Sequence, residues 1–148
     1  MSDRGYFGIG CFHLKNGLNY GTLFRSAQIM GASYVFLIGR RFKRQASDTM
    51  KSWRHMPVFE YESITDLKNN LPYDCRLIGV ELINEAKPIY DYTHPQRACY
   101  ILGAEDSGLS KEVLNSCHDI IILPGERSMN VSVAGSIVMY DRLYKQQL

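Results

Sequence analysis

The chain has 148 residues, the length of a single domain that is large enough to bury a core. Hydrophobic residues make up 45% and charged residues 22%, as in an ordinary globular protein. The net charge of +2 excludes a polycation, and no apolar run approaches the ~18 residues that a membrane span requires. Because no signal peptide opens the chain, we expect a cytoplasmic protein without a membrane partner.

The four cysteines are far apart and form no C-x-x-C pair. They lie mostly in apolar stretches, which is typical of buried free thiols in a reducing compartment. The spacing also offers no zinc site, so we expect no bound metal.

Apolar runs separated by turn residues predict strands that alternate with helices. Strands are predicted at residues 6–12, 33–39, 58–61, 76–82, 98–102 and 119–123. Helices are predicted at residues 19–30, 47–55, 64–71, 110–117 and 130–146, and an irregular connection at residues 87–95. The central strands are continuous apolar runs, so we predict an α/β domain with a mainly parallel sheet and helices on both faces. In such sheets, ligands bind beyond the carboxyl ends of the strands, here after Phe12, Leu102 and Leu123.

The first candidate segment opens the first predicted helix and reads Asn19-Tyr20-Gly21-Thr22-Leu23-Phe24-Arg25. Asn19 is predicted to cap this helix. Arg25 follows six residues later, roughly 240° around the helix. Its neighbours are apolar, so we expect part of its stem to be covered. An ordinary surface charge is the alternative interpretation.

The second candidate segment follows the strand at residues 98–102 and reads Gly103-Ala104-Glu105-Asp106-Ser107-Gly108-Leu109-Ser110. Gly103 permits close approach of another backbone, and Gly108 permits a positive φ. Glu105 places an acid at the ligand end of a strand. A plain loop capped by Ser110 would explain Gly108 and Ser110 but would leave Gly103 and Glu105 without a reason.

The third candidate segment lies between the last strand and the last helix. A Pro124-Gly125 turn is followed by the small polar residues Ser128, Asn130 and Ser132. Free backbone N–H groups and the helix dipole meet at such a junction, which favours ligand binding. If Asn130 were only a helix cap, Ser128 and Ser132 would remain unexplained.

Together, the three segments resemble the three motifs of the SpoU/TrmH family of RNA 2′-O-methyltransferases, part of the SPOUT superfamily. The first is similar to Asn-x-Gly-x-x-x-Arg, and the second is similar to Gly-x-Glu-x-x-Gly-Leu. The resemblance covers nearly the whole chain and is closest to the minimal, TrmL-like members that consist of the catalytic domain alone. It implies one methyltransferase domain over residues 1–148, without a separate RNA-binding extension.

The resemblance further implies a C-terminal trefoil knot that holds S-adenosylmethionine, with the adenine in an apolar slot. The cofactor-binding residues that it implies are Val80, Leu102, Gly103, Leu123, Pro124, Ser128, Met129 and Ser132. It also implies a homodimer through the last helix. This helix carries more apolar residues than one face can hide, although a fully buried core helix is the alternative.

The implied reaction transfers the sulfonium methyl group to a ribose 2′-hydroxyl, with Arg25 as the catalytic residue. A guanidinium with a pKa above about 12 is a reluctant base. Alternatively, Arg25 clamps an RNA phosphate and polarises the hydroxyl while water takes the proton. Ser128 and Asn130 would position the ribose and the arginine, and Asn19 is a further residue of the implied catalytic set. Glu105 would fix its own loop or Arg25 of the partner subunit.

The implied substrate is RNA, with tRNA favoured and rRNA as the alternative. Between residues 40 and 55, six basic residues and the single acid Asp48 give a local charge of +5. The basic residues are Arg40, Arg41, Lys43, Arg44, Lys51 and Arg54. They are candidates for phosphate contacts, with Tyr20, Phe42 or Trp53 for base stacking. A solvated basic loop is the alternative.

Two other functions remain as alternatives. A dinucleotide-binding oxidoreductase would need G-x-G-x-x-G, but His13 stands where the glycine after Gly8 and Gly10 should be. A catalytically inactive RNA-binding module of the same fold would differ from an enzyme in not needing to bind the cofactor.

Overall fold

The computed structural model describes residues 5–13, 17–39, 43–44, 48, 51–104 and 107–147. Its strands are β1 (Tyr6–Phe12), β2 (Tyr34–Ile38), β3 (Val58–Tyr61), β4 (Arg76–Val80), β5 (Lys87–Pro88), β6 (Arg97–Gly103) and β7 (Asp119–Ile122). Its helices are α1 (Gly17–Ile29), α2 (Ile64–Asn69), α3 (Lys111–Ser116) and α4 (Val131–Gln146), with 3₁₀ turns η1 (Ser52–Arg54) and η2 (Ile89–Asp91).

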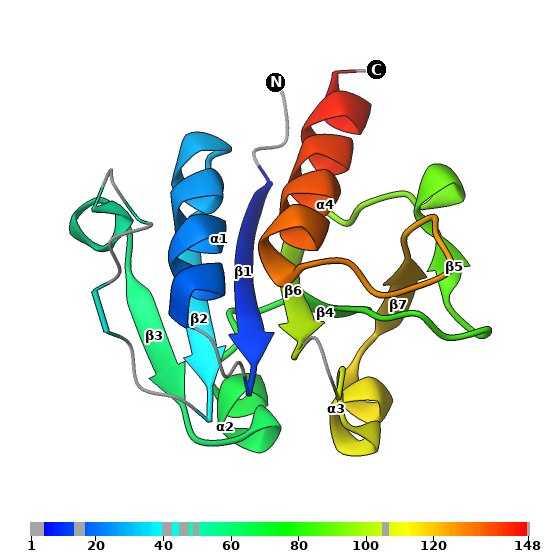
Figure 1. Ribbon diagram of the computed structural model, residues 1–148, viewed down its shortest axis with the longest axis horizontal. Coiled ribbons are helices and arrows are strands. Elements are labelled where there is room, and N and C mark those ends of the chain that lie inside the picture. Colours follow the sequence, from blue (N-terminus) through cyan, green and yellow to red (C-terminus); the bar gives the residue numbers. More distant parts are fainter. Residues whose placement is uncertain are drawn as a thin grey trace.

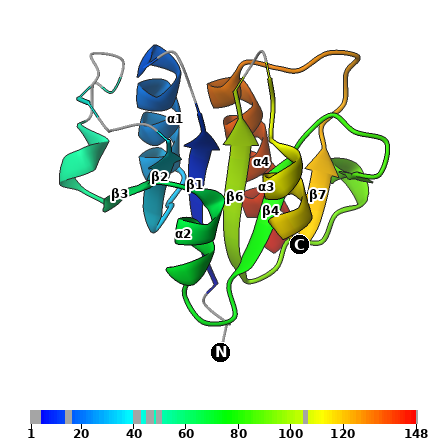
Figure 2. The same ribbon diagram turned by 90° about the horizontal axis from the view of Figure 1, so that it is seen from below.

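Within these residues, the strands form one parallel sheet in the order β3-β2-β1-β6-β4-β7-β5. Helices α1 and α4 pack against one face, and α2 and α3 pack against the other (Figures 1 and 2). The predicted α/β domain with a parallel sheet covered on both faces is therefore confirmed. Because all strands run the same way, their carboxyl ends meet along one edge of the sheet.

The central strands are buried on both faces, as their continuous apolar sequences predict. Every residue of β2 is buried. Side chains alternate between the two cores: Phe7 and Ile9 of β1 face α1 and α4, whereas Tyr34 and Phe36 of β2 face α2 and α3. This alternation divides the interior into two apolar layers that fix the helices to the sheet.

Most predicted elements are found within two residues of their observed bounds, but two differ. The short helix predicted at residues 47–55 is only the 3₁₀ turn η1 among the residues described there. The connection at residues 87–95 contains β5 and η2. Both residues of β5 are exposed, so no apolar pattern announced this edge strand. Helix α1 begins at Gly17, two residues before the predicted start.

A buried polar network fastens the far end of α4 to the sheet. Arg142, only 1% exposed, donates hydrogen bonds to the carbonyl oxygens of Pro95 and Gln96, each at 2.7 Å. The His94 ring bridges the Tyr100 hydroxyl at 2.6 Å and an Asp141 carboxylate oxygen at 2.7 Å. The network holds α4 in place, so its amino end is fixed at the carboxyl edge of the sheet.

The predicted free thiols are confirmed, because all four cysteines are unpaired and Cys11, Cys75 and Cys99 are buried. Burial raises the pKa of the Cys11 and Cys99 thiols well above their ordinary value. These thiols are therefore protonated and act as small apolar core residues. In the described part of the chain, no helix is long and apolar enough to cross a bilayer.

Candidate active site

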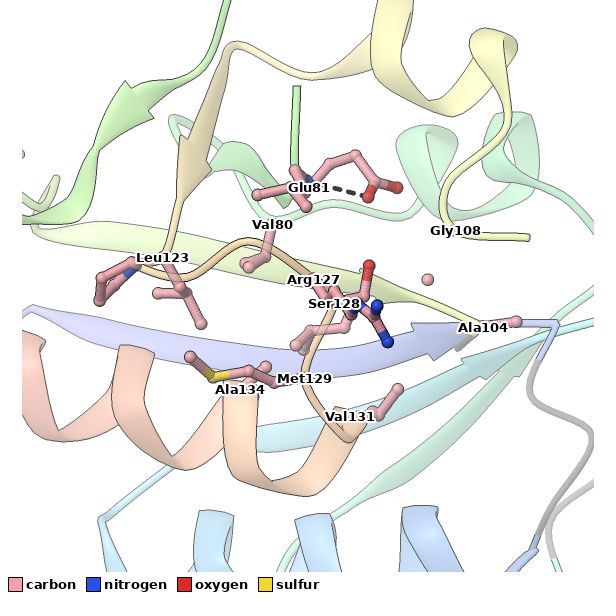
Figure 3. A pocket seen from close by; sticks show the side chains of 14 residues that line it. Val80, Glu81, Ala104, Gly108, Leu123, Arg127, Ser128, Met129, Val131 and Ala134 are labelled. Atoms are coloured by element: carbon pink, nitrogen blue, oxygen red, sulfur yellow. Dashed lines mark hydrogen bonds between the residues drawn. The ribbon is translucent and has the colours of Figure 1, made fainter. Parts of the chain in front are cut away.

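A cavity opens at the carboxyl ends of β4, β6 and β7, where the sequence places its second and third candidate segments (Figure 3). It encloses about 540 Å³, including its open mouth. Its lining residues are Val80, Glu81, Leu82, Leu102, Gly103, Ala104, Gly108, Leu123, Pro124, Arg127, Ser128, Met129, Val131 and Ala134. The fold therefore brings together segments that are up to 54 positions apart in the sequence, from Val80 to Ala134.

The cavity has apolar walls and a few polar groups at its rim. Val80, Leu102, Leu123 and Met129 form much of the apolar lining. All the residues predicted to contact a cofactor lie in this lining except Ser132. A largely apolar cavity with a few convergent polar groups has the character of a small-molecule site.

The loop after β6 closes onto its own strand through two glycines. A Cβ atom on Gly103 would collide with the backbone of Gly108 and Leu109. Gly108 has a φ of +65°, and its N–H donates to the carbonyl of Ala104 at 2.7 Å. Both predicted glycine roles are confirmed, with one addition: the backbone that approaches Gly103 belongs to the same loop. This crossing forms one wall of the cavity.

Glu81 fastens this loop to the neighbouring strand β4. One carboxylate oxygen accepts a hydrogen bond from the Leu109 N–H at 2.7 Å, and the other accepts from the Leu82 N–H at 2.9 Å. The carboxylate also occupies the space that a Cβ on Gly108 would need. Sequence reasoning missed Glu81 because the predicted strand ran from residue 76 to 82 and placed it inside the strand. Strand β4 ends at Val80 and leaves Glu81 just beyond the strand end, in a sequence position comparable to that of Glu105.

Arg127 is a second lining residue that the sequence analysis did not select. It is exposed and lies beside Ser128 at the cavity (Figure 3). Its cationic group and the Glu81 carboxylate give the rim of the cavity charges of both signs.

The first and third candidate segments meet through a pair of asparagines. The Asn130 side-chain amide donates to the Asn19 side-chain oxygen at 2.9 Å, across 111 positions of sequence. The Asn130 oxygen caps α4 by accepting from the backbone N–H groups of Ser132, at 2.9 Å, and Val133, at 3.4 Å. The prediction that Asn19 caps α1 is wrong, because the helix already begins at Gly17. Asn19 lies in the first turn, is 8% exposed and bonds to Asn130 instead.

The other predicted catalytic residues and the predicted cofactor-binding residue Ser132 occupy different surroundings. Ser128 is exposed and lines the cavity. Ser132 is buried, and its hydroxyl donates to the Asn130 side-chain oxygen at 2.8 Å, so it supports the asparagine pair from behind. Arg25 is exposed on α1, and partial covering of its stem stays a prediction. Glu105 lies outside the described residues.

Comparison with known proteins agrees with this geometry. The model of the SpoU rRNA Methylase family matches residues 7–140, which is most of the chain. The chain belongs to the SpoU methylase family. All three candidate segments of this SpoU family member lie within the matched range.

Curated relatives of this SpoU chain are longer than it is. It is 27% identical over 137 residues to the tRNA (guanosine(18)-2′-O)-methyltransferase of Escherichia coli K12, covering 87% of this chain and 59% of that protein. It is 25% identical over 132 residues to the 23S rRNA (guanosine-2′-O-)-methyltransferase RlmB of Acinetobacter baylyi, covering 83% and 53%. The chain thus spans between half and three fifths of these two relatives.

Solved structures share the fold of this SpoU chain. A protein studied for 2-OH methylation of C/U34 on tRNA superposes with a TM-score of 0.79 at 20% identity, covering 98% of each chain. The SpoU methyltransferase AviRb of Streptomyces viridochromogenes, in complex with AdoMet, gives a TM-score of 0.83 at 18% identity and covers 99% of this chain and 60% of that one.

In the basic segment of this SpoU member, the described turn η1 lies beside α1 and before the edge strand β3 (Figure 1). Lys43, Arg44, Lys51 and Arg54 are exposed, as phosphate contacts require. Arg40, Arg41 and Phe42 lie outside the described residues. The interpretation of Tyr20 as a base-stacking residue is wrong, because its ring is completely buried against α1 and the sheet.

Helices α1 and α4 also leave an apolar surface uncovered. Exposed apolar side chains on these helices are Ile29, Val133, Tyr140 and Tyr144. A shallow groove between them is lined by Thr22, Met30, Ser132, Val133, Ser136, Ile137 and Tyr140. The last helix is therefore not a fully buried core helix, and its second apolar face is exposed as predicted.

Proposed function

We propose that this chain is an S-adenosylmethionine-dependent RNA methyltransferase that acts on a ribose 2′-hydroxyl. The observation that carries the proposal is the cavity at the carboxyl edge of the sheet, joined by Asn130 to the first helix. The SpoU family match and the 2′-O-methyltransferase names of the curated relatives support it.

The lining of the cavity fits S-adenosylmethionine in its chemistry. Its apolar walls suit an adenine ring, and the loop that crosses at Gly103 brings backbone groups close to a ligand. Arg127 suits the carboxylate of the methionine part, and Glu81 suits a hydroxyl or amino group. When bound, the cofactor would supply an electrophilic methyl group.

The residues of this chain would orient the ribose and handle its proton. A ribose hydroxyl is a poor nucleophile, so positioning carries much of the rate, ~7–11 kcal/mol in favourable intramolecular cases. The hydrogen bond from Asn130 restrains the Asn19 side chain, and Asn130 is itself restrained as the cap of α4. The pair therefore places oriented amide groups beside the cavity. Ser128 lies at the rim, where it can accept or donate a bond to the ribose.

Arg25 is proposed as the residue that meets the RNA backbone. Its exposure on α1 leaves the guanidinium available for bidentate contact with a phosphate. In this role it would polarise the 2′-hydroxyl while water takes the proton. The alternative, in which Arg25 itself is the base, requires loss of a proton from a guanidinium, a group that stays protonated in proteins. A supporting role for Glu105 stays a prediction.

Transfer RNA is the proposed substrate class, with ribosomal RNA as the alternative. The protein studied for methylation of C/U34 on tRNA matches over 98% of both chains, and the E. coli relative also acts on tRNA. The A. baylyi relative, which acts on 23S rRNA, keeps rRNA open. The basic segment containing Lys43, Arg44, Lys51 and Arg54 is proposed to contact the RNA.

A homodimer through α1 and α4 is proposed as the working assembly. The exposed Val133, Tyr140 and Ile29 side chains and the groove between these helices favour burial against a second copy. The trefoil knot that the family resemblance implies is likewise a proposal about the C-terminal segment.

The test measures transfer of labelled methyl groups from S-adenosylmethionine to unmodified total RNA, separated into tRNA and rRNA. Label in the 2′-O-methyl nucleosides of the tRNA fraction, lost in Arg25→Ala and kept in Arg76→Ala, is the expected result. Arg76 is an exposed arginine at the opposite end of the sheet, so it is a matched control. Absence of both label and cofactor binding would favour the inactive RNA-binding module instead.

A further inference from the structure

The basic segment contains an arrangement that its sequence does not reveal: one tryptophan holds two arginines. The guanidinium carbon of Arg44 lies 3.8 Å from the centre of the Trp53 ring, and that of Arg54 lies 4.9 Å from it. Both cations are attracted to the ring electrons. The two carbons are therefore no farther apart than these two distances together, which is close to the screening length of about 8 Å at physiological salt.

The acid of this segment is already engaged and does not neutralise the arginines. Asp48 is only 4% exposed, and its carboxylate accepts two hydrogen bonds at 3.1 Å from the Ser52 backbone N–H and another from the Ser52 hydroxyl. These bonds hold the turn in which Lys51 adopts a left-handed conformation, with a φ of +49°. Among the described residues, neither Arg44 nor Arg54 has a carboxylate partner.

A second anchor ties the basic segment to the first helix. The buried Tyr20 hydroxyl donates to the carbonyl oxygen of Lys43 at 2.6 Å and accepts from the Lys43 N–H at 2.8 Å. Tyr20 follows Asn19, which is bonded to Asn130 beside the cavity. The position of Arg44 is thereby coupled to the candidate active site through partly buried hydrogen bonds at Tyr20 and Asn19, which are neighbours in the chain.

Two like charges kept together on one ring, without an ion-pair partner in the described part of the chain, are arranged for an anionic ligand. We infer that Arg44 and Arg54, ordered by Trp53, form a preassembled phosphate-binding pair for the substrate RNA. This inference rests on the proposed function and assigns the pair to nucleotides that flank the methylated one, because the pair lies on the β3 side of α1 and the cavity lies on the other side (Figure 1).

In this arrangement Trp53 is a positioning residue and not a platform for RNA bases. The residue is partly buried, and its ring already contacts two guanidinium groups. It acts on the RNA through the arginines, by reducing the conformational freedom that each loses on binding. Substitution of Trp53 should therefore weaken RNA binding while the number of charges that meet phosphates is retained.

The test measures binding of unmodified bulk tRNA over a series of KCl concentrations, beside S-adenosylmethionine binding and thermal unfolding. The double variant Arg44→Gln/Arg54→Gln is expected to bind tRNA about 10- to 30-fold more weakly at 150 mM KCl. The slope of log affinity against log salt should become shallower by about 1.4–1.8, the value for two phosphate contacts. Cofactor affinity should not change.

The matched control is Arg76→Gln/Arg97→Gln, which removes the same charge from exposed arginines at the amino ends of β4 and β6. An equal loss of tRNA affinity in this control would overturn the inference in favour of a general charge effect. Trp53→Leu should lower tRNA affinity several-fold with little change in the slope, and Trp53→Phe should restore most of it.

The inference and the proposed function can fail separately. If bulk tRNA shows the expected salt slope and no methyl transfer occurs, the phosphate-binding pair stands and the enzymatic proposal falls. If methyl transfer occurs and the double variant has unchanged tRNA affinity and slope, the pair is overturned. If Trp53→Leu flattens the slope as much as the double variant, the ring does not act merely by positioning the arginines.

Discussion

The cavity beside β4, β6 and β7 and the basic segment beside β3 are built on opposite principles. The cavity depends on close packing: Gly103 and Gly108 are packed backbone against backbone, and Glu81 holds the loop with two hydrogen bonds. The basic segment depends on positive charge: the exposed residues Arg44 and Arg54 both lie against the ring of Trp53. Helix α1 lies between the two regions. Its Asn19 bonds to Asn130 beside the cavity, and its Tyr20 bonds to Lys43 of the basic segment.

This difference matches the two unlike ligands of the proposed function. A small cofactor is recognised by close contact in a site from which much of the water is removed, so a single misplaced methyl group matters. A nucleic acid is recognised first by its phosphates, so the count of cations matters and salt weakens the interaction. The two regions should respond to different perturbations.

The largest effect is expected at the glycine crossing. A methyl group on Gly103 would collide with backbone, which cannot move aside. One on Gly79 would meet side chains, the nearest being those of Cys117 at 3.0 Å and Leu109 at 3.2 Å. Gly103→Ala should therefore lower S-adenosylmethionine affinity by more than about 100-fold, with a stability loss of about 1–3 kcal/mol. Calorimetric titration and thermal melting would measure both effects.

The control Gly79→Ala should keep cofactor affinity within about threefold if side-chain crowding is absorbed, as volume changes at yielding sites usually are. Equal losses for the two variants would show that the crossing has no special part in the cavity.

The next effect is the response to salt. If the four exposed basic residues of the segment each contact a phosphate, RNA affinity should fall about 50- to 150-fold when KCl rises from 50 to 200 mM. The lower figure applies to single-stranded RNA and the higher to a duplex. Cofactor affinity should change less than about threefold over that range, because its contacts are mostly apolar. Parallel titrations of the two ligands would measure this, and a common salt dependence would erase the distinction between the regions.

A smaller effect is expected where the two regions meet. Asn130→Ala removes the cap of α4 and the bond to Asn19, which should cost about 1 kcal/mol and lower the melting temperature by roughly 2–4 °C. RNA methylation should fall by about tenfold or more, because the amide groups beside the cavity lose their fixed orientation.

Ser63→Ala provides the matched comparison, since Ser63 caps α2 by accepting from the Asp66 N–H at 3.1 Å, far from the cavity. It should cost similar stability and leave methylation unchanged. Equal activity losses in the two variants would mean that Asn130 matters only for folding.

The smallest effect is expected from acid, which should weaken the polar network of His94 and Asp141 that holds α4 against the sheet. Burial lowers the pKa of His94, and the nearby charges of Arg142 and Lys145 lower it further. The hydrogen bond to Asp141 acts in the opposite direction, but the net shift is downward. The folded protein thus holds this proton less tightly than the unfolded chain, whose imidazole titrates near pH 6.5. The stability that the network contributes is present above that pH and is lost as the pH falls below it.

Thermal melting at pH 7.5 and 5.5 would measure this loss, expected to be a few degrees at most. In His94→Gln the difference between the two pH values should shrink. A drop of the same size in that variant would assign the acid sensitivity to other groups.

Sequence reasoning located the cavity well because its clues were local. The apolar strands ending in Leu102 and Leu123 gave the sheet edge, and the glycine at position 108 announced a positive φ that the structure has. It failed where an interaction depended on a distant partner. Asn19 looked like a helix cap because nothing nearby showed that its partner was Asn130, 111 positions away.

The basic segment shows the same limit. Its composition predicted phosphate contacts, but the pattern Lys51-Ser52-Trp53-Arg54 does not show which arginines reach the ring. Tyr20 was assigned to base stacking because aromatic residues suit that role. Its neighbours along a buried helix face and the carbonyl of Lys43 decide otherwise.

The sequence by itself determined the parallel sheet, the order of its main elements and the three segments at its ligand edge, because apolar periodicity, glycines and helix caps act over a few residues. Only the tertiary structure decided which polar groups meet: Asn19 with Asn130, Glu81 with Leu109, and Arg44 with Trp53. These pairs depend on how strands and helices pack, and packing joins residues that no local pattern connects.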